Sequence, residues 1–446
     1  MTIRLESIRE CFEGVVPATM STASPDGVPN LAYLSQVQFV DGEHVALSYQ
    51  FFNKTRQNIM ANPRASLIVT HPVTVAQYRL TLQYLHTETS GPLFEVMKAK
   101  LAGIASHTGM SGVFRLLGSD VYRVLDVERL AGETQPAQVP PCNLLSALRA
   151  TTHRLAACTD LERLMAELLS CLRQQFNLHH AMLLLLDAPG ARLYTVASMG
   201  YEASGAGSEI PLGQGVIGVA ARERTPIRIG HMTSEYAYSR AVRESAENSD
   251  WASALETAIP LPGLPSPRSQ LAVPITAVQR LLGVLYVESP LDLRFTYDDE
   301  DALVSVAAQF GMAMHILQTA AVDAGEDTAT MAAAPPRQGG SPLVVRHFAE
   351  NDSVFLGDDY LIKGVAGSIL CTLLRDYLDK GRSEFTNREL RLDSRIRLPD
   401  VSDNLEARLI LLGKRLVDRS APIRIEKTGR GRFRLCVERP LLLQAT

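Results

Sequence analysis

The sequence predicts a multidomain α+β protein with three domains in series. The chain has 446 residues, which is too many for one hydrophobic core. Two stretches rich in Pro, Gly, Ala and small polar residues, 131–142 and 321–342, interrupt its apolar periodicity, and the second is typical of a flexible linker. We therefore predict domains at 1–130, 143–320 and 343–446.

The composition is that of a soluble globular protein, with 46% hydrophobic and 21% charged residues. The N-terminus lacks the apolar core of a signal peptide, and no run of about 18 uncharged apolar residues occurs, so we expect a cytoplasmic location. The net charge of −4 conceals a local excess, because residues 380–440 hold 16 Lys and Arg against 9 Asp and Glu.

The cysteines are scattered and form no CxxC pair, so we expect neither a disulfide framework nor a metal site. They are Cys11, Cys142, Cys158, Cys171, Cys371 and Cys436.

The first domain has the pattern of a small antiparallel barrel. Residues 28–49 alternate around the turn pair Asp41-Gly42 and predict a hairpin. Residues 55–61 suit a short helix that ends at Asn62-Pro63. The remaining predicted elements are strand 65–70, strand 77–88, helix 94–104 and strand 121–130.

This order, with the segment from Ser48 through NKTRQNIMANPRASLIV, resembles the pyridoxamine-phosphate-oxidase-like family of FMN-binding split barrels across residues 10–130. The resemblance implies an antiparallel split β-barrel, FMN as cofactor, and a flavin site shared by the two subunits of a homodimer. No His/Arg pair of the true oxidase is evident, so we do not expect the vitamin B6 reaction.

The resemblance also implies which residues would hold the flavin. A phosphate needs cations together with N–H or hydroxyl donors, and the start of a helix adds a favourable electric field and backbone N–H groups. Alternatively, Lys54 and Arg56 are solvated turn charges in a barrel that has lost its cofactor. The implied phosphate contacts are Lys54, Thr55 and Arg56, and the implied ring contacts are Ser48, Tyr49 and Gln50.

The second domain alternates helices and strands. Leucines at helical spacing fill residues 143–176, and residues 180–200 form a hydrophobic hairpin. A short helix opens at Gly213-Gln214-Gly215, and a strand pair spans 269–289. A terminal helix follows over 295–318, with Thr296 as candidate cap and acidic residues in its first turn.

The phrases PLGQGVIGVA, LAVPI and GVLYVES resemble a GAF domain across residues 145–320. The resemblance implies an α/β/α sensor fold with a small-ligand pocket between the sheet and its capping loops. Aromatic and polar residues of the capping segment suit such a pocket, or alternatively they only pack a lid over the sheet. No cysteine occurs in that segment, which argues against a covalently attached bilin. The candidate pocket residues are His231, Tyr236, Tyr238, Arg240 and Trp251.

The third domain contains short strands and three helices, followed by a basic hairpin. The helices fall at 364–381, 386–392 and 403–419, and Thr386 with Glu389 has capping-box spacing. In the last helix a leucine stripe predicts one buried face beside a basic face. The stripe comprises Leu405, Leu409, Leu412 and Leu416.

The phrases LEARLILLGKRL and TGRGRFRL resemble the winged helix-turn-helix DNA-binding domain of response-regulator-type transcription factors, over about residues 343–438. The resemblance implies that the third helix enters the major groove while the hairpin follows the backbone. Alternatively, the domain contacts protein and its arginines are solvated. The implied base contacts are Asn404 and Arg408, and the implied phosphate contacts are Lys414, Arg415, Arg419, Arg430, Arg432 and Arg434.

Together these patterns favour a bacterial-type, one-component transcriptional regulator. It would sense a small molecule or a redox state and act on DNA as a homodimer. One alternative is an FMN-dependent oxidoreductase of the split-barrel type with regulatory modules, and another is a protein-binding adaptor.

Overall fold

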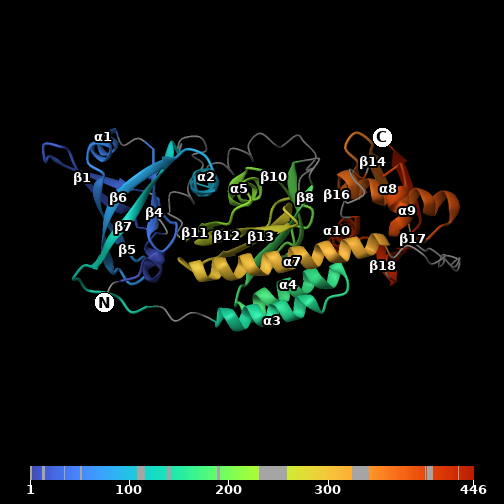
Figure 1. Ribbon diagram of the computed structural model, residues 1–446. Coiled ribbons are helices and arrows are strands. Elements are labelled where there is room, and N and C mark those ends of the chain that lie inside the picture. The colour runs from blue at the N-terminus through green and yellow to red at the C-terminus, as the bar shows by residue number, and fades with distance from the viewer. Residues whose placement is uncertain are drawn as a thin grey trace.

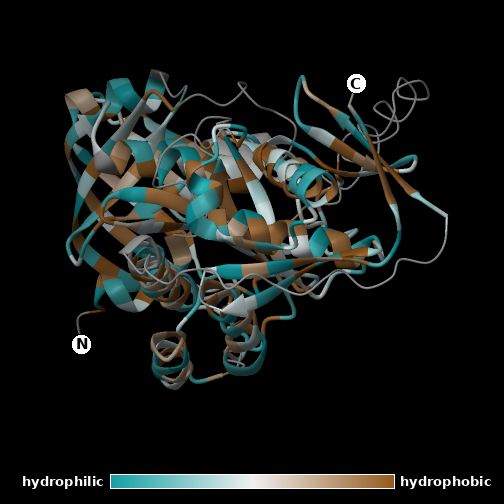
Figure 2. Ribbon diagram, turned by 90° about the vertical axis from the view of Figure 1, so that its right-hand side faces the viewer, coloured by the Kyte–Doolittle hydropathy of each residue, from teal (hydrophilic) through white to brown (hydrophobic). Residues whose placement is uncertain are grey.

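The computed structural model describes residues 3–445, apart from 13–15, 35, 51–52, 108–115, 138–141, 188–190, 231–258, 324–340, 397, 399–404 and 430. Three bodies follow one another along the molecule, and helix α7 (Tyr297–Asp323) runs beneath the central one towards the C-terminal one (Figure 1). The hydrophobic stretches of the central strands lie inside, between helices (Figure 2).

The first body is an antiparallel seven-stranded sheet, curled into a barrel in the order β2-β1-β5-β6-β7-β4-β3. A 3-10 helix, η1 (Leu5–Phe12), buries Leu5, Ile8 and Phe12 in the barrel core. The other elements are β1 (Ala18–Ala23), β2 (Pro29–Leu34), β3 (Val37–Phe39), β4 (His44–Tyr49), α1 (Asn53–Ala61), β5 (Arg64–Thr70), β6 (Gln77–Glu88), α2 (Pro92–His107) and β7 (Gly118–Arg129).

One detail of the barrel corrects the sequence-based expectation. Residues 28–40 do not form one long hairpin strand, because β2 pairs with β1 while only β3 pairs with β4. Strand β1, which we did not expect from the sequence, supplies the partner of β2 and lets the sheet curl.

The second body is a six-stranded antiparallel sheet in the order β10-β9-β8-β13-β12-β11. Because strand residues alternate between faces, Leu271 and Leu285 pack towards α3, α4 and α7, while Ala272 and Tyr286 face α5. Its elements are α3 (Leu144–Ala156), α4 (Leu161–Gln175), β8 (His180–Asp187), β9 (Arg192–Met199), β10 (Glu209–Pro211), α5 (Gly215–Glu223), β11 (Ile227–Ile229), β12 (Ser269–Ala277), β13 (Arg280–Ser289) and α7.

Helix α7 begins as its sequence predicts. The backbone N–H of Asp299 donates to Thr296 Oγ1 at 3.2 Å, so the expected cap is confirmed. Its residues Tyr297–Thr319 are, by length and composition, the one candidate membrane span among the described residues, and the helix packs against β12 and α3.

The third body combines two small sheets and three helices. The sheets have the orders β16-β15-β14-β20 and β17-β19-β18. The capping box of Thr386 and Glu389 is present, as predicted. The elements are β14 (Leu343–Phe348), β15 (Ser353–Leu356), β16 (Asp359–Ile362), α8 (Gly364–Lys380), β17 (Glu384–Thr386), α9 (Asn387–Leu392), α10 (Leu405–Asp418), β18 (Ile423–Gly429), β19 (Arg432–Val437) and β20 (Leu441–Ala445).

Among the described residues, two sets of contacts join the bodies. Helix α2 of the barrel packs against α5 and β11, and Arg9 donates to Asp301 at 2.6 Å. At the other end, α10 packs against β9 and α4, and one continuous hydrophobic cluster joins the helical face of the second body to the third. The barrel keeps a core of its own.

Candidate functional site

A pocket of about 260 Å³ lies on the α5 side of the second body. Its walls come from the strands β8, β12 and β13, from α5, and from the segment that leads into β12. We call it the sheet pocket, and its described lining includes Met182, Ile217, Pro262, Gln270, Tyr286 and Glu288.

Local sequence explains how α5 reaches the pocket. Gly213 and Gly215 adopt positive φ angles of 84° and 60°, which glycine tolerates best. A Cβ on Gly218 would stand 2.4 Å from the carbonyl oxygen of Pro211, so the helix packs too closely for alanine. The phrase PLGQGVIGVA therefore fixes a tight loop that sets Ile217 against the sheet.

The polar end of the sheet pocket is a buried carboxylate, because Glu288 is only 4% exposed. Its Oε1 accepts the backbone N–H of Leu264 at 2.7 Å, and its Oε2 accepts the hydroxyl of Tyr286 at 3.0 Å. Gln270 is the direct cross-strand partner of Glu288, so the amide and the carboxylate lie side by side.

Tyr201 adds a second phenol next to this carboxylate. Its hydroxyl is buried beside the carboxylate of Glu288. Burial, followed by the charge of Glu288, raises the pKa of Tyr201, so the phenol stays protonated. The site thus joins one carboxylate, one amide and two phenols beside an apolar wall.

The pocket residues expected from the sequence are a different set. His231, Tyr236, Tyr238, Arg240 and Trp251 lie outside the described residues. We missed Gln270 and Glu288, although both sit at the ends of the phrases SQLAVPI and GVLYVES. The signal was a polar residue that continues an apolar strand on its inward face.

The second candidate site lies in the barrel, where the structure brings most of the expected flavin contacts together. Ser48, Tyr49, Thr55 and Arg56 line a cavity of only about 10 Å³. Gln50 is buried outside this lining, and Lys54 is exposed on α1.

Arg56 already forms hydrogen bonds with other protein side chains at this site. Its guanidinium donates to Asp120 at 2.7 Å and to Thr87 at 3.0 Å, and it stacks over the ring of Tyr49. The carboxylate of Asp120 compensates its charge, which weakens the case for Arg56 as a phosphate ligand.

Two buried hydroxyl groups and the size of the cavity show whether the described barrel residues can hold FMN. The buried Oγ atoms of Ser48 and Ser119, which are cross-strand partners, have no hydrogen-bond partner within the described part of the chain. They favour a polar occupant, yet the cavity holds about one water molecule. The described residues of one chain therefore do not fit an isoalloxazine ring by themselves.

The structure corrects the expected DNA-facing side of α10. Arg408 is 5% exposed and donates to Asp187 of β8 at 2.9 Å, with its guanidinium over the ring of Tyr194. Lys414 Nζ donates to the carbonyl oxygen of Val196 at 3.1 Å, and burial lowers the pKa of Lys414. In this arrangement neither side chain is available to DNA.

Arg415 is buried as well, and its side chain lies next to Gly207 of the second body. Its Nε donates to the carbonyl oxygen of Leu361 at 3.0 Å. The reason is that α10 buries the leucine stripe on one side and also Ala407 and Leu411, so the helix is enclosed on more than one face. The single leucine stripe predicted only one buried face of α10, so the burial of Arg415 was not expected from the sequence.

The other expected DNA contacts differ in exposure. Arg419 is exposed, Arg432 is half-buried, and the exposed Arg434 donates to Glu384 at 2.7 Å. Asn404 and Arg430 lie outside the described residues.

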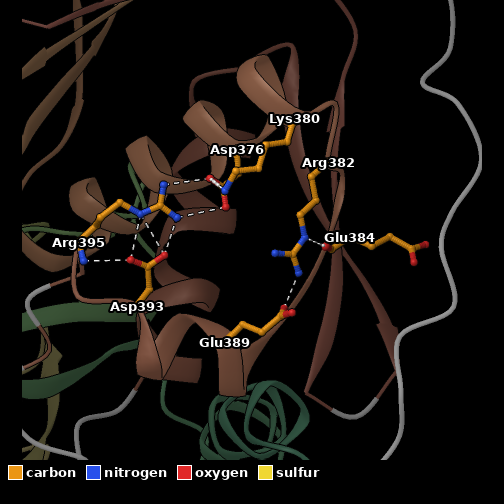
Figure 3. A network of polar contacts seen from close by, with 7 residues as sticks. All are labelled: Asp376, Lys380, Arg382, Glu384, Glu389, Asp393 and Arg395. Atoms are coloured by element: carbon orange, nitrogen blue, oxygen red, sulfur yellow. Dashed lines mark hydrogen bonds and ion pairs between the residues drawn. The ribbon is translucent and has the colours of Figure 1, made fainter.

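A polar network holds α8 and α9 of the third body together (Figure 3). Arg395 donates to both oxygens of Asp376, at 2.9 and 3.1 Å, and also to Asp393. Lys380 donates to Asp376 at 3.0 Å. These hydrogen bonds, chiefly those from Arg395, lower the pKa of both carboxyl groups.

Fold and site together define a multidomain α+β protein that couples a curled antiparallel barrel to an α/β/α domain with a ligand-sized pocket. Family models name these two parts. The model of the GAF domain matches residues 160–314, and that of pyridoxamine 5'-phosphate oxidase matches residues 5–97. The chain therefore contains a GAF domain and a split barrel of the FMN-binding type, which confirms both resemblances.

Individual relatives cover parts of the chain. An uncharacterized protein of Methanocaldococcus jannaschii is 37% identical over 68 residues, which are 15% of this chain and 46% of that protein. An FMN-binding protein of Syntrophomonas wolfei is 15% identical, with a TM-score of 0.25, over 29% of this chain and 86% of that one. The GAF domain of an Acinetobacter phosphoenolpyruvate-protein phosphotransferase is 20% identical, with a TM-score of 0.31. This similarity covers 41% of this chain and 96% of that domain.

Proposed function

We propose that this protein is a ligand-responsive regulator in which the GAF domain controls whether a C-terminal winged helix is free to bind DNA. The element order of the third body supports the winged-helix assignment. Three strands, three helices with α10 as the third, and a hairpin of β18 and β19 follow in that sequence.

The observation that carries the proposal is the docking of α10 on the GAF domain. Arg408 pairs with Asp187 across the two bodies, and the side-chain exposures of 6% and 22% make this a largely buried pair. The helix expected to read bases is thus the helix that the sensor holds. A ligand that alters the GAF sheet would shift the balance between a docked and a released α10.

A second pair of contacts supports the docked state. Lys363 lies 3.1 Å from Glu209 of β10, and Lys427 lies 3.5 Å from Asp160 at the start of α4. Both lysines come from the third body and both carboxylates from the GAF domain. Because these pairs are partly exposed, they contribute only modestly to the docked state.

The test releases α10 without changing a residue expected to touch DNA. Asp187→Asn removes the charge that holds Arg408, and loss of one partner of a buried pair costs about 3–5 kcal/mol. We expect affinity for the protein's own upstream DNA to rise on the order of tenfold at about 50 mM salt. The control is Asp379→Asn, at an exposed position on α8. It also removes one negative charge and should leave the affinity for DNA unchanged.

The alternatives make different predictions in that assay. If neither the wild type nor Asp187→Asn binds upstream or scrambled DNA, the regulator proposal fails and the third body is a protein-contact module. If both bind with the same affinity, DNA binding stands and the docking of α10 has no regulatory role.

A further inference from the structure

We propose that a groove beside the C-terminal hairpin of β18 and β19 binds a small, uncharged, apolar molecule. This groove is separate from the sheet pocket of the GAF domain. The inference goes beyond the proposed regulator function and does not depend on DNA binding by the third body.

The groove lies where α10, the hairpin and the start of α4 meet, and we call it the hairpin groove. Its volume of about 580 Å³ falls in the range of about 300–1,000 Å³ that small-molecule sites occupy. The apolar side chains that line it come from α10 and from both strands of the hairpin, and they are Leu409, Ile410, Val417, Ile425 and Phe433. The groove is therefore large enough for a small organic ligand and offers it an apolar surface.

Most charged side chains around the hairpin groove already have protein partners. Lys427 lies 3.9 Å from Glu406 and 3.5 Å from Asp160 of the GAF domain. Arg424 lies 2.7 Å from Glu438. A charged ligand would therefore have to displace an existing partner, whereas an uncharged ligand leaves these pairs in place.

Two side chains that line the hairpin groove show that its wall disfavours charge of either sign. Burial raises the pKa of the Glu406 carboxyl and lowers the pKa of the Lys414 ammonium. In both groups burial favours the neutral form, although the two groups carry opposite charges. A ligand that brought its own charge into the groove would meet the same desolvation cost, so the wall favours a neutral ligand.

Gly413 keeps one side of the hairpin groove open. It lies within α10, where glycine is less favourable than alanine. A Cβ at this position would meet no atom within 4 Å, so close packing of the protein does not require glycine. A ligand that lies against the helix backbone accounts for it, because glycine permits such a close approach.

Two fluorescent probes, N-phenyl-1-naphthylamine and 1-anilinonaphthalene-8-sulfonate, test the inference on the full-length protein. They share one ring skeleton, and only the sulfonate carries a charge at neutral pH. We expect the wild type to bind the uncharged probe more tightly by on the order of tenfold or more. Gly413→Leu should weaken binding of the uncharged probe on the order of tenfold, because the new side chain fills the groove.

The matched control is Gly132→Leu, which adds the same side chain at an exposed position outside the groove. A Cβ at Gly132 also meets no atom within 4 Å, so this variant should bind both probes as the wild type does. A second groove variant is Val417→Asn, at a side chain that is 69% exposed, so the fold should tolerate it. It should weaken binding of the uncharged probe roughly three- to tenfold by removing apolar surface.

Equal affinity of the wild type for the two probes, or no binding of the uncharged probe, would overturn the inference. Unchanged affinity for the uncharged probe in a folded groove variant would also overturn it, because the probe would then bind elsewhere. The same holds if Gly132→Leu weakens binding as much as Gly413→Leu does. Each of these results leaves the regulator proposal standing, since the Asp187→Asn assay on DNA uses no probe.

Discussion

At the residue scale, this protein uses arginine–carboxylate pairs to hold its helices and strands together. Arg408 joins α10 to the GAF sheet, Arg56 closes the barrel site on Asp120, and Arg395 links Asp376 and Asp393. The planar guanidinium suits this task because it donates several hydrogen bonds in fixed directions.

The Arg395 network should make stability depend on acidity. The pKa values of Asp376 and Asp393 are lower in the folded state than in the unfolded chain, where carboxyl groups of this type titrate near about 3.9. Their stabilisation is therefore complete above roughly pH 5 and is lost as pH falls through the folded pKa values. We expect the melting temperatures of wild type and Asp376→Asn to differ at pH 7 and to converge below about pH 4. A difference that is constant with pH would contradict this.

At the element scale, glycine sets how closely strands and helices approach. Gly283 lies in β13, and a Cβ there would stand 2.1 Å from the carbonyl oxygen of Leu184 in the neighbouring strand. Gly413 lies within α10, and a Cβ there would meet no atom within 4 Å. Glycine is therefore required by close packing in β13, whereas in α10 a larger side chain would fit.

Alanine at these two positions should shift stability in opposite directions. Gly283→Ala crowds two strands and should destabilise the fold by about 1–3 kcal/mol. Gly413→Ala gains helix propensity in open space and should stabilise it by about 0.5–1 kcal/mol. Urea denaturation of both variants against wild type measures the shifts. A Gly283→Ala variant as stable as wild type would show that the sheet relaxes around the new methyl group.

At the scale of the whole molecule, the barrel has an uncovered apolar surface on its edge strand β2. Leu31 and Tyr33 are 61% and 69% exposed, and Val28 before the strand is 55% exposed. An apolar edge strand of this kind invites pairing with another chain. Because the described residues of one chain leave a cavity of only about 10 Å³ at the expected flavin site, we propose that two chains join through this edge and complete the FMN site between them.

This homodimer should be visible in light scattering and in flavin content. We expect a dimer at micromolar concentration and flavin absorbance that remains after gel filtration with FMN. Leu31→Glu places a charge on the exposed edge and should lower both dimer and flavin content, while Lys54→Ala should lower flavin content alone by removing an exposed phosphate contact. A wild-type monomer that retains flavin would contradict the shared site.

The sequence by itself determined much of the local structure, because periodicity, caps and turn residues act over a few neighbouring positions. It predicted the α7 cap, the Thr386 capping box and the leucine stripe of α10. The phrases PLGQGVIGVA and GVLYVES indicated the GAF domain, which its family model confirms.

Only the tertiary structure decided which faces meet. Arg408 looked like a solvent-facing base reader, yet Asp187 lies 221 positions away and no local pattern couples the two. Gln270 and Glu288 became a site only when strand register set them side by side. Burial of a polar side chain depends on what packs over it, and that partner is chosen by the whole fold rather than by its neighbours in sequence.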